Sequence, residues 1–340
     1  MERYFPGSNT ADGFKGFYDG ELERLDKVIL LKGGPGTGKS SLMKAVAKES
    51  AKKGLDHEIW YCSGDPSSVD GVYVKDIGAA VVDATAPHAT EARLPVIRES
   101  VTDMAQSLAR DRLLPERGKI EKLFYLKKRS YERAYEHLNR AFGYSEKKWR
   151  EYSRLADIEG IRREAAAFAL SVSDGAGVAQ RGKRRTRNMF STAITADGAV
   201  SFYDHLVGKR VYRVNACDEG VHLFVGEVAR LVAGDVMLLH NSLRPERLDA
   251  VVTREFAVTG DAGVFSTAAD VIDISAKEGN AAFETEFFRS REKEETGYAV
   301  SDLASARASH LEAEKFFVAA MDFSVADTLT FRVMKEIFGD

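Results

Sequence analysis

One stretch decides the fold of this 340-residue chain: Leu30-Leu31-Lys32-Gly33-Gly34-Pro35-Gly36-Thr37-Gly38-Lys39-Ser40-Ser41. It has the spacing G-x-x-x-x-G-K-[ST], it follows the apolar run at 28–31, and a helix-compatible stretch comes after it. A polyphosphate is bound by successive backbone N–H groups, and glycine lets the backbone approach it closely, at positive φ where required. The stretch therefore predicts a phosphate-binding loop between a strand and a helix.

The motif gives a role to each of its residues. Lys39 can reach the β- and γ-phosphates, and the Ser40 hydroxyl can hold Mg²⁺. The helix expected over 39–53 points its positive end at the phosphates. The residues expected to bind the nucleotide are Gly33, Gly34, Pro35, Gly36, Thr37, Gly38, Lys39, Ser40 and Ser41.

The amino-acid composition excludes few classes of function. Lys plus Arg (49) nearly balances Asp plus Glu (52), so the overall charge gives no case for nucleic-acid binding. Cys62 and Cys217 suggest neither a disulfide framework nor a metal cluster, as expected in a reducing cytoplasm. The N-terminus has no signal-peptide pattern, and no apolar run reaches about 18 residues. We therefore expect a soluble, cytoplasmic protein with no membrane partner.

A segment of the first half is repeated in the second. Residues 10–19 (TADGFKGFYD) recur as residues 195–204 (TADGAVSFYD), with seven of the ten identical. This repeat predicts an internal duplication. We expect two α/β lobes, each like a P-loop NTPase, with a parallel sheet flanked by helices and a long helical arm.

The expected boundaries follow from the repeat and from composition. The first lobe is expected over 1–174, with its arm at about 95–170 as an antiparallel helical pair broken near Gly143. A flexible, basic linker is expected over 175–186. The second lobe is expected over 187–340, with its arm at about 277–321. Basic residues of the first arm indicate either a solvated helix face or a contact with a protein or nucleic-acid partner.

The second lobe carries a degenerate form of the loop, Asn215-Ala216-Cys217-Asp218-Glu219-Gly220-Val221-His222. Val221 stands where Lys39 would be, and His222 stands in place of Ser40. Two acids have been gained, and they would repel a phosphate. We therefore expect no nucleotide in the second lobe, and we expect residues kept in both lobes to be structural. Those residues are Asp12, Asp19 and Asp70, matched by Asp197, Asp204 and Asp249, which are predicted to bond backbone N–H groups in turns and caps.

Three further residues are candidates for chemistry in the first lobe. Asp83 ends an apolar strand at 79–82, a pattern typical of an acid that holds Mg²⁺, with a loop cap as the alternative. Asp65 could act as a base that orients a water or a substrate hydroxyl. His88, together with Thr85, could position the terminal phosphate. An ordinary polar loop is the alternative for these last residues.

Four segments carry a resemblance to a known family: residues 5–14 (FPGSNTADGF), 32–40 (KGGPGTGKS), 62–71 (CSGDPSSVDG) and 82–88 (VDATAPH). The chain resembles a family of bacterial, mainly Firmicute-type, duplicated phosphate-loop ATPases of unassigned role. The resemblance covers nearly the whole chain and implies ATP binding. Members commonly carry a second working loop, and this chain departs from them at 215–222.

Three functions fit these features. The first is a Mg²⁺-dependent ATPase with one working site, whose hydrolysis moves the lobes or arms. The second is a kinase that transfers the γ-phosphoryl group to a nucleotide or small hydroxyl compound under a helical lid. The third is an ATP-gated binding module with little catalysis, which is favoured by Ala84 at the position after Asp83 where many such hydrolases have glutamate.

Overall fold

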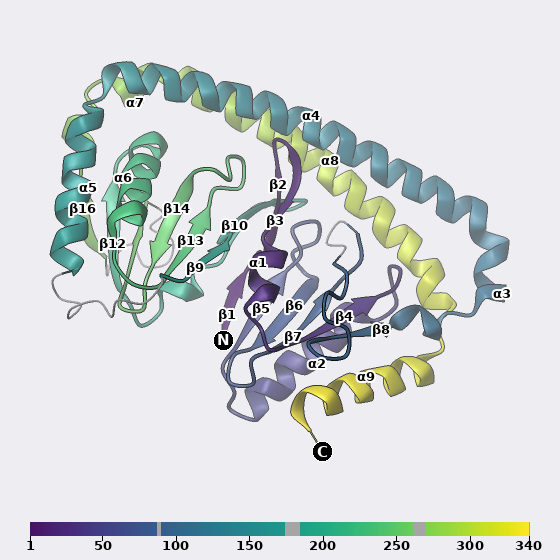
Figure 1. The fold of residues 1–340 in the computed structure, drawn as a ribbon. Coiled ribbons are helices and arrows are strands. Elements are labelled where there is room, and N and C mark those ends of the chain that lie inside the picture. The colour runs from purple at the N-terminus through teal and green to yellow at the C-terminus, as the bar shows by residue number, and fades with distance from the viewer. Residues whose placement is uncertain (87–89, 174–183, 261–268, 340) are drawn as a thin grey trace.

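The computed structural model describes residues 1–86, 90–173, 184–260 and 269–339. Two sheets, each flanked by helices, form two lobes, and two long helices lie across both of them (Figure 1). The protein is thus an α/β protein with two sheet-and-helix lobes, as the sequence predicted.

The first sheet is mixed, so the prediction of a parallel sheet was wrong. Its strand β6 runs antiparallel to both neighbours, whereas the other pairs are parallel. The connections on either side of β6 are short, and parallel strands need a crossover of about a dozen residues or more. The strands lie in the order β1 (Glu2–Tyr4), β5 (His57–Tyr61), β6 (Val69–Val74), β7 (Ala79–Asp83), β4 (Lys27–Lys32) and β8 (Glu99–Asp103).

The second sheet has the same strand order and the same directions. Its strand β14 is antiparallel to both neighbours, and its other pairs are parallel. The order is β9 (Thr186–Met189), β13 (Val236–His240), β14 (Leu248–Val252), β15 (Phe256–Thr259), β12 (Arg210–Asn215) and β16 (Asp270–Asp273). Each strand of the second sheet therefore has a counterpart in the first. The predicted linker lies mostly outside the described residues, and β9 begins at Thr186.

Helix α2 (Lys39–Lys52) covers one face of the first sheet. Its buried side chains Leu42 and Met43 lie one turn before Val46, and all three pack in one cluster with Ile29 of β4. The helix ends just before Gly54, which has a φ of 72°. Helix α6 (Asp218–Leu231) is its counterpart in the second lobe. Shorter segments are α1 (Tyr18–Glu23), η1 (Met104–Ser107), α3 (Arg110–Leu113), η2 (Leu114–Glu116), η3 (Asp204–Leu206), η5 (Ser275–Lys277) and α7 (Ala281–Glu284).

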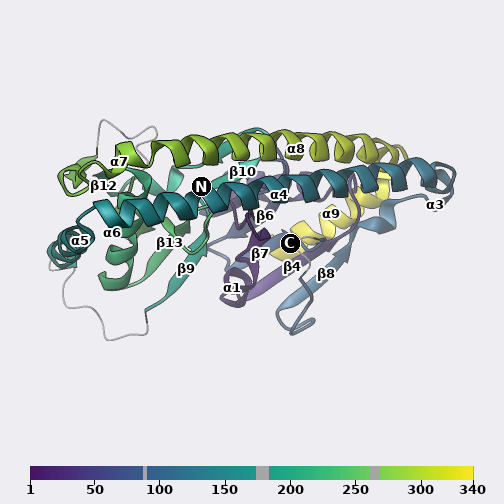
Figure 2. The same cartoon turned by 90° about the horizontal axis from the view of Figure 1, so that it is seen from above.

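The long helices are α4 (Arg117–Leu155) and α8 (Glu286–Ala319), and they run side by side across both lobes (Figures 1 and 2). Contacts such as Phe124–Phe317 and Arg140–Glu295 show that they are antiparallel. The expected break near Gly143 was wrong, because α4 is continuous there. One glycine costs a helix about 1 kcal/mol, and the packing of α4 on α8 on either side of it outweighs that cost. The antiparallel partner of α4 is thus a helix of the second half, not a neighbour in its own arm.

The last helix of each half packs in the opposite lobe. Helix α5 (Ile158–Ser173) buries Ile161 and Ala165 with the core of the second lobe. Helix α9 (Phe323–Phe338) buries Leu329 and Val333 in the cluster that contains β4 and α2 of the first lobe. The sequence boundary near 174–187 therefore separates the repeats but not the packed cores.

Two hairpins reach from the lobes to the long helices: β2 (Gly7–Thr10) with β3 (Gly13–Gly16), and β10 (Thr192–Thr195) with β11 (Gly198–Ser201). In both turns the repeated threonine donates from its hydroxyl to a glycine carbonyl, Thr10 to Gly13 at 2.7 Å and Thr195 to Gly198 at 2.8 Å. The carboxylate of Asp197, expected to bond backbone, instead accepts two hydrogen bonds of 2.6 Å from Arg307 of α8. In both copies of the repeated segment, the threonine hydroxyl thus makes the hydrogen bond that closes the turn.

Candidate functional site

The loop between β4 and α2 has the backbone geometry of an anion cradle. Gly33, Gly36 and Gly38 have φ values of 144°, 67° and 85°, in the region that favours glycine. Gly38 precedes α2 without any side-chain cap, and the first turn of α2 carries no acid. The N–H groups at the start of this helix are thus free of a competing carboxylate from the helix itself.

Lys39 is held on the loop itself. Its side chain is 9% exposed, and Nζ donates to the carbonyls of Gly33 and Gly34 at 2.7 and 2.8 Å. Thr37 is buried and its hydroxyl also donates to Gly34, at 2.9 Å. The lysine therefore lies against the inner side of the cradle, with its charge beside the backbone that would hold a phosphate.

Asp83 lies beside Lys39, and Ser40 is the next residue of α2. Asp83 Oδ2 lies 3.7 Å from Lys39 Nζ, and Oδ1 accepts hydrogen bonds from the backbone N–H, at 2.9 Å, and the hydroxyl of Thr85. One oxygen thus caps the following loop while the other faces the phosphate loop, so both expected roles of this carboxylate are compatible with its geometry. Burial raises the pKa of Asp83, and the Lys39 ammonium and the Thr85 bonds offset only part of that rise.

Asp70 is a neighbour of this site that the sequence reasoning placed among the turn and cap aspartates. It is 5% exposed, and it accepts a hydrogen bond of 3.3 Å from the Tyr18 hydroxyl. The residue before it, Val69, donates its N–H to Ser40 Oγ at 3.0 Å. Asp70 is therefore a second buried carboxyl group of the first lobe, and it follows the residue that contacts the predicted magnesium hydroxyl. The signal available in the sequence was its place one residue into a strand that was not recognised.

Asp65 lies at the other side of the site. Its carboxylate accepts from the N–H and hydroxyl of Ser67, at 3.2 and 2.8 Å, and it lies 3.9 Å from Arg307 of α8. This carboxylate therefore orders a turn and faces the long helices. His88 and Pro87 lie outside the described residues.

The C-terminal end of α8 rests on the phosphate loop. A methyl group placed on Gly36 would lie 2.9 Å from Val318 Cγ2 and 3.1 Å from the Glu314 carbonyl oxygen. A methyl group on Gly34 would lie 3.4 Å from the Phe317 ring. The loop of the first lobe is thus covered by a helix from the second half of the chain, which the sequence did not reveal.

The equivalent loop of the second lobe holds a carboxylate of the protein itself. Helix α6 begins at Asp218, three residues earlier than the repeat predicts from Lys39 and Val221. The buried side chain of Glu278 accepts the N–H of Cys217 with both oxygens, each at 3.1 Å, and the hydroxyl of Tyr152 at 3.0 Å. A negative group of the chain therefore occupies the N-terminus of α6, where a phosphate would otherwise bind.

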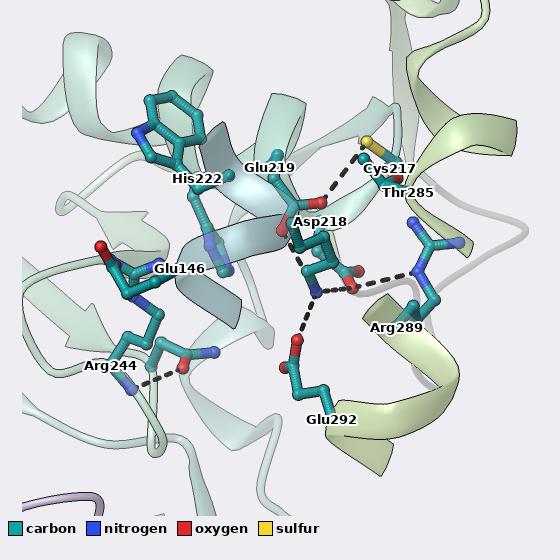
Figure 3. A network of polar contacts seen from close by, with 12 residues as sticks. Glu146, Cys217, Asp218, Glu219, His222, Arg244, Thr285, Arg289 and Glu292 are labelled. Carbon is teal, nitrogen blue, oxygen red and sulfur yellow. Dashed lines mark hydrogen bonds and ion pairs between the residues drawn. The ribbon is translucent and has the colours of Figure 1, made fainter. Parts of the chain in front are cut away.

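A buried lysine balances the acids around this second loop. Lys148 of α4 is 3% exposed and lies 3.1 Å from Glu219, 2.8 Å from Glu292 and 3.6 Å from Asp218. Figure 3 shows these three carboxylates converging, with Arg289 beside Asp218. Burial alone would lower the pKa of Lys148, but the carboxylates of Glu219 and Glu292 more than offset it, so the pKa is raised. The charged side chains around the second loop thus pair with one another.

His222 completes the contrast between the loops. It stands in the place of Ser40, and its Nε2 lies 3.2 Å from Asp249, the counterpart of Asp70. An imidazole therefore lies where the first lobe has the Ser40 hydroxyl.

The described residues show neither a metal-binding cluster nor a membrane-spanning helix. Within the described residues, no group of three or more His, Cys, Asp or Glu side chains is arranged to hold a metal ion by itself. No described helix combines the length and apolarity needed to cross a membrane. Comparison of the chain with protein-family models, with curated proteins and with solved structures found no match.

Proposed function

We propose that the first lobe binds ATP with Mg²⁺ and hydrolyses it, and that the second lobe binds no nucleotide. The proposal is carried by the contrast between the two equivalent loops. In the first, the N-terminus of α2 carries no capping side chain and is lined by left-handed glycines and a lysine. In the second, Glu278 occupies the N-terminus of α6.

The residues of the first lobe fit a polyphosphate. The N–H groups of the loop and of the first turn of α2 would bind the phosphate oxygens, and Lys39 would exchange its loop carbonyls for them. Ser40 and Asp83 would hold Mg²⁺, with Asp70 close by. The ion would neutralise negative charge on the phosphates.

Two observations support a duplicated phosphate-loop protein with one degenerate lobe. The sheets share strand order and direction, and the repeated segments at 10–19 and 195–204 form equivalent hairpins. We infer that the lobes arose by internal duplication, in line with the family that the chain resembles. The second lobe then acts as a scaffold that carries α8 to the active loop.

The packing of α8 on the phosphate loop favours an ATP-gated binding module as the second candidate function. Because Glu314 and Val318 lie against Gly36, a nucleotide that reshapes the loop would also shift the end of α8. A kinase remains a third candidate, with α4 and α8 acting as a lid over an acceptor.

The test combines calorimetric binding with an assay of phosphate release. We expect wild type to bind one Mg·ATP per chain, and Lys39→Ala to weaken binding by about 10- to 100-fold, because a charged hydrogen bond is lost. Lys48→Ala, at an exposed lysine of the same helix, is the matched control. Equal ATP binding by wild type and Lys39→Ala would overturn the proposal. Phosphate release without an acceptor indicates an ATPase, release only with an acceptor a kinase, and binding without release a module.

A further inference from the structure

Lys127 of α4 lies between two residues of the same helix that reach the phosphate loop side and the loop after β5. Three residues before it, Phe124 stacks on Phe317, which lies over the phosphate loop at Gly34. Four residues after it, Tyr131 lies against the other loop, since a methyl group on Gly64 would be 2.8 Å from the Tyr131 hydroxyl. Residues three and four apart share one face of a helix. Lys127 therefore faces the site between these two fixed contacts.

His310 of α8 contacts Lys127. Four residues after it, Glu314 lies against Gly36, and three residues before it, Arg307 lies 3.9 Å from Asp65. The Lys127 ammonium and His310 Nδ1 are 3.1 Å apart. Burial, reinforced by the Lys127 charge, lowers the pKa of His310 to about 4, so its imidazole is neutral at pH 7 and accepts the lysine hydrogen.

The charge of Lys127 is not balanced by an acid. Among the described residues, no carboxylate lies within the 4.0 Å of an ion pair from its ammonium, although the side chain is half-buried. Lys39, by contrast, has Asp83 at 3.7 Å. Burial lowers the pKa of Lys127, Cys62 acts in the opposite direction, and the Lys39 ammonium lowers the pKa further. The two ammonium groups thus repel each other, and an anion between them would stabilise this arrangement.

The second lobe supplies an internal comparison. Asp157 and Asp322 are equivalent, because each caps the helix that follows and donates its N–H to a matching carbonyl, that of Lys277 at 2.8 Å and that of Ser107 at 2.7 Å. Thirty residues before these two aspartates stand Lys127 and Glu292. Glu292 pairs with Lys148 in the network of the second loop. This helix position therefore carries a cation, Lys127, above the loop of the first lobe. In the second lobe it carries an acid, Glu292, beside the loop that Glu278 occupies.

We propose that Lys127, oriented by His310, binds the terminal phosphate of the nucleotide held by the first loop. The inference rests on the proposed nucleotide site and deepens it, since it makes the α4–α8 pair part of that site. The helices would then sense a triphosphate and not a diphosphate, because only a triphosphate carries the terminal phosphate that Lys127 would contact. Nucleotide binding would couple to the position of both long helices.

The test compares Lys127→Met with Lys128→Met in the full chain, since Lys128 is exposed on a neighbouring face of α4. We expect Lys127→Met to weaken Mg·ATP binding by about 10- to 100-fold while Mg·ADP binding changes by less than about threefold. Lys128→Met should leave both dissociation constants unchanged. Equal losses for ATP and ADP, or no loss for either, would overturn the role of Lys127. Failure of wild type to bind either nucleotide would instead overturn the proposed function.

The melting temperature without nucleotide separates this role from a structural one. Removal of a half-buried, unbalanced cation should leave the melting temperature unchanged or raise it. A lower melting temperature for Lys127→Met would show that the lysine stabilises the fold and would count against the proposal. Lys127→Arg keeps the charge and should bind ATP more tightly than Lys127→Met, and equal weakness of the two would also overturn the assignment.

Discussion

Glu278 accepts the backbone N–H of Cys217 with both of its carboxylate oxygens, each at 3.1 Å. Two segments about sixty residues apart thus reproduce, inside the protein, the contact that a phosphate makes with a helix N-terminus. The same carboxylate accepts from the Tyr152 hydroxyl at 3.0 Å, which ties helix α4 to the loop. A fixed part of the second lobe therefore occupies the N-terminus of α6.

Removal of this carboxylate should destabilise the protein. Glu278→Ala leaves the N–H of Cys217 and the hydroxyl of Tyr152 buried without their acceptor, and we expect a loss of about 1–3 kcal/mol in the free energy of unfolding. Glu284→Ala, at an exposed position of α7, should change it by less than about 0.5 kcal/mol. Urea unfolding measures both. An unchanged stability of Glu278→Ala would contradict the role given to Glu278.

The thiol of Cys217 should react slowly in the native protein. Burial, with the hydrogen bond to Glu278, raises the pKa of Cys217 to about 12. At pH 8 about one thiol in ten thousand is then ionised, and the thiolate is the reactive form. Thiol labelling of a Cys62→Ser protein should thus be very slow, should rise with pH beyond 9, and should be faster in Glu278→Gln. Labelling at the rate of a free cysteine would show that Cys217 is not buried and hydrogen-bonded to Glu278.

Asp83→Asn should stabilise the protein without ligand and weaken its binding of Mg·ATP. A carboxyl whose pKa is raised on folding stabilises the fold below its unfolded pKa of about 3.9, and that contribution is lost as the pH rises through the folded pKa. At pH 7 the buried carboxylate therefore opposes folding, and asparagine can still accept from Thr85. The gain in melting temperature should shrink toward pH 4. Asp111→Asn, at an exposed site of α3, should show no such trend, and a destabilised Asp83→Asn at pH 7 would count against this view.

Gly36→Ala should disturb both the loop and its contact with α8. The φ of 67° costs a residue with a side chain about 1–2 kcal/mol, and the new methyl group would press on Val318 at 2.9 Å. Adding Val318→Ala should restore the stability that the contact with Val318 cost, whereas the stability lost to backbone strain should stay lost. Gly118→Ala, where a methyl group meets nothing within 4 Å, should instead stabilise α4 by about 0.5–1 kcal/mol. If Gly36→Ala leaves stability and ATP binding unchanged, α8 does not constrain the loop.

The first lobe should depend on a helix from the end of the chain. Leu329 of α9 is 4% exposed and packs with Ile29 and Met43, so Leu329→Ala should cost about 2–5 kcal/mol. It should also weaken ATP binding, because β4 and α2 carry the phosphate loop. Phe331→Ala, two residues further along α9 and 69% exposed, is the matched control. The free energy of unfolding and the dissociation constant for ATP should be measured for both variants. If Leu329→Ala changed neither quantity, the packing of α9 in the first lobe would not support that lobe.

Local elements were well predicted where one signal dominated. Helix α2 begins at Lys39 and ends before Gly54, because the glycine loop and the C-terminal glycine mark both ends. Strand β6 was missed, since Val69–Val74 contains Asp70 and Gly71 and lies among turn residues. Its presence made the sheet mixed and placed the backbone of Val69 against Ser40. The continuity of α4 through Gly143 was missed because its partner is α8, far along the chain.

The sequence by itself determined the glycine-rich loop at 33–40, the different loop at 215–222 and the repeated segment, because glycine conformation, charge and hydrogen bonding act over a few residues. Only the tertiary structure decided which acids and cations surround each loop. Glu278, Lys148, Lys127 and His310 reach the loops through helices α4 and α8 and the segment before α7, and these pack where their apolar faces find partners in the other half of the chain. Such long-range pairing depends on the fit of whole surfaces, and short-range patterns do not encode it.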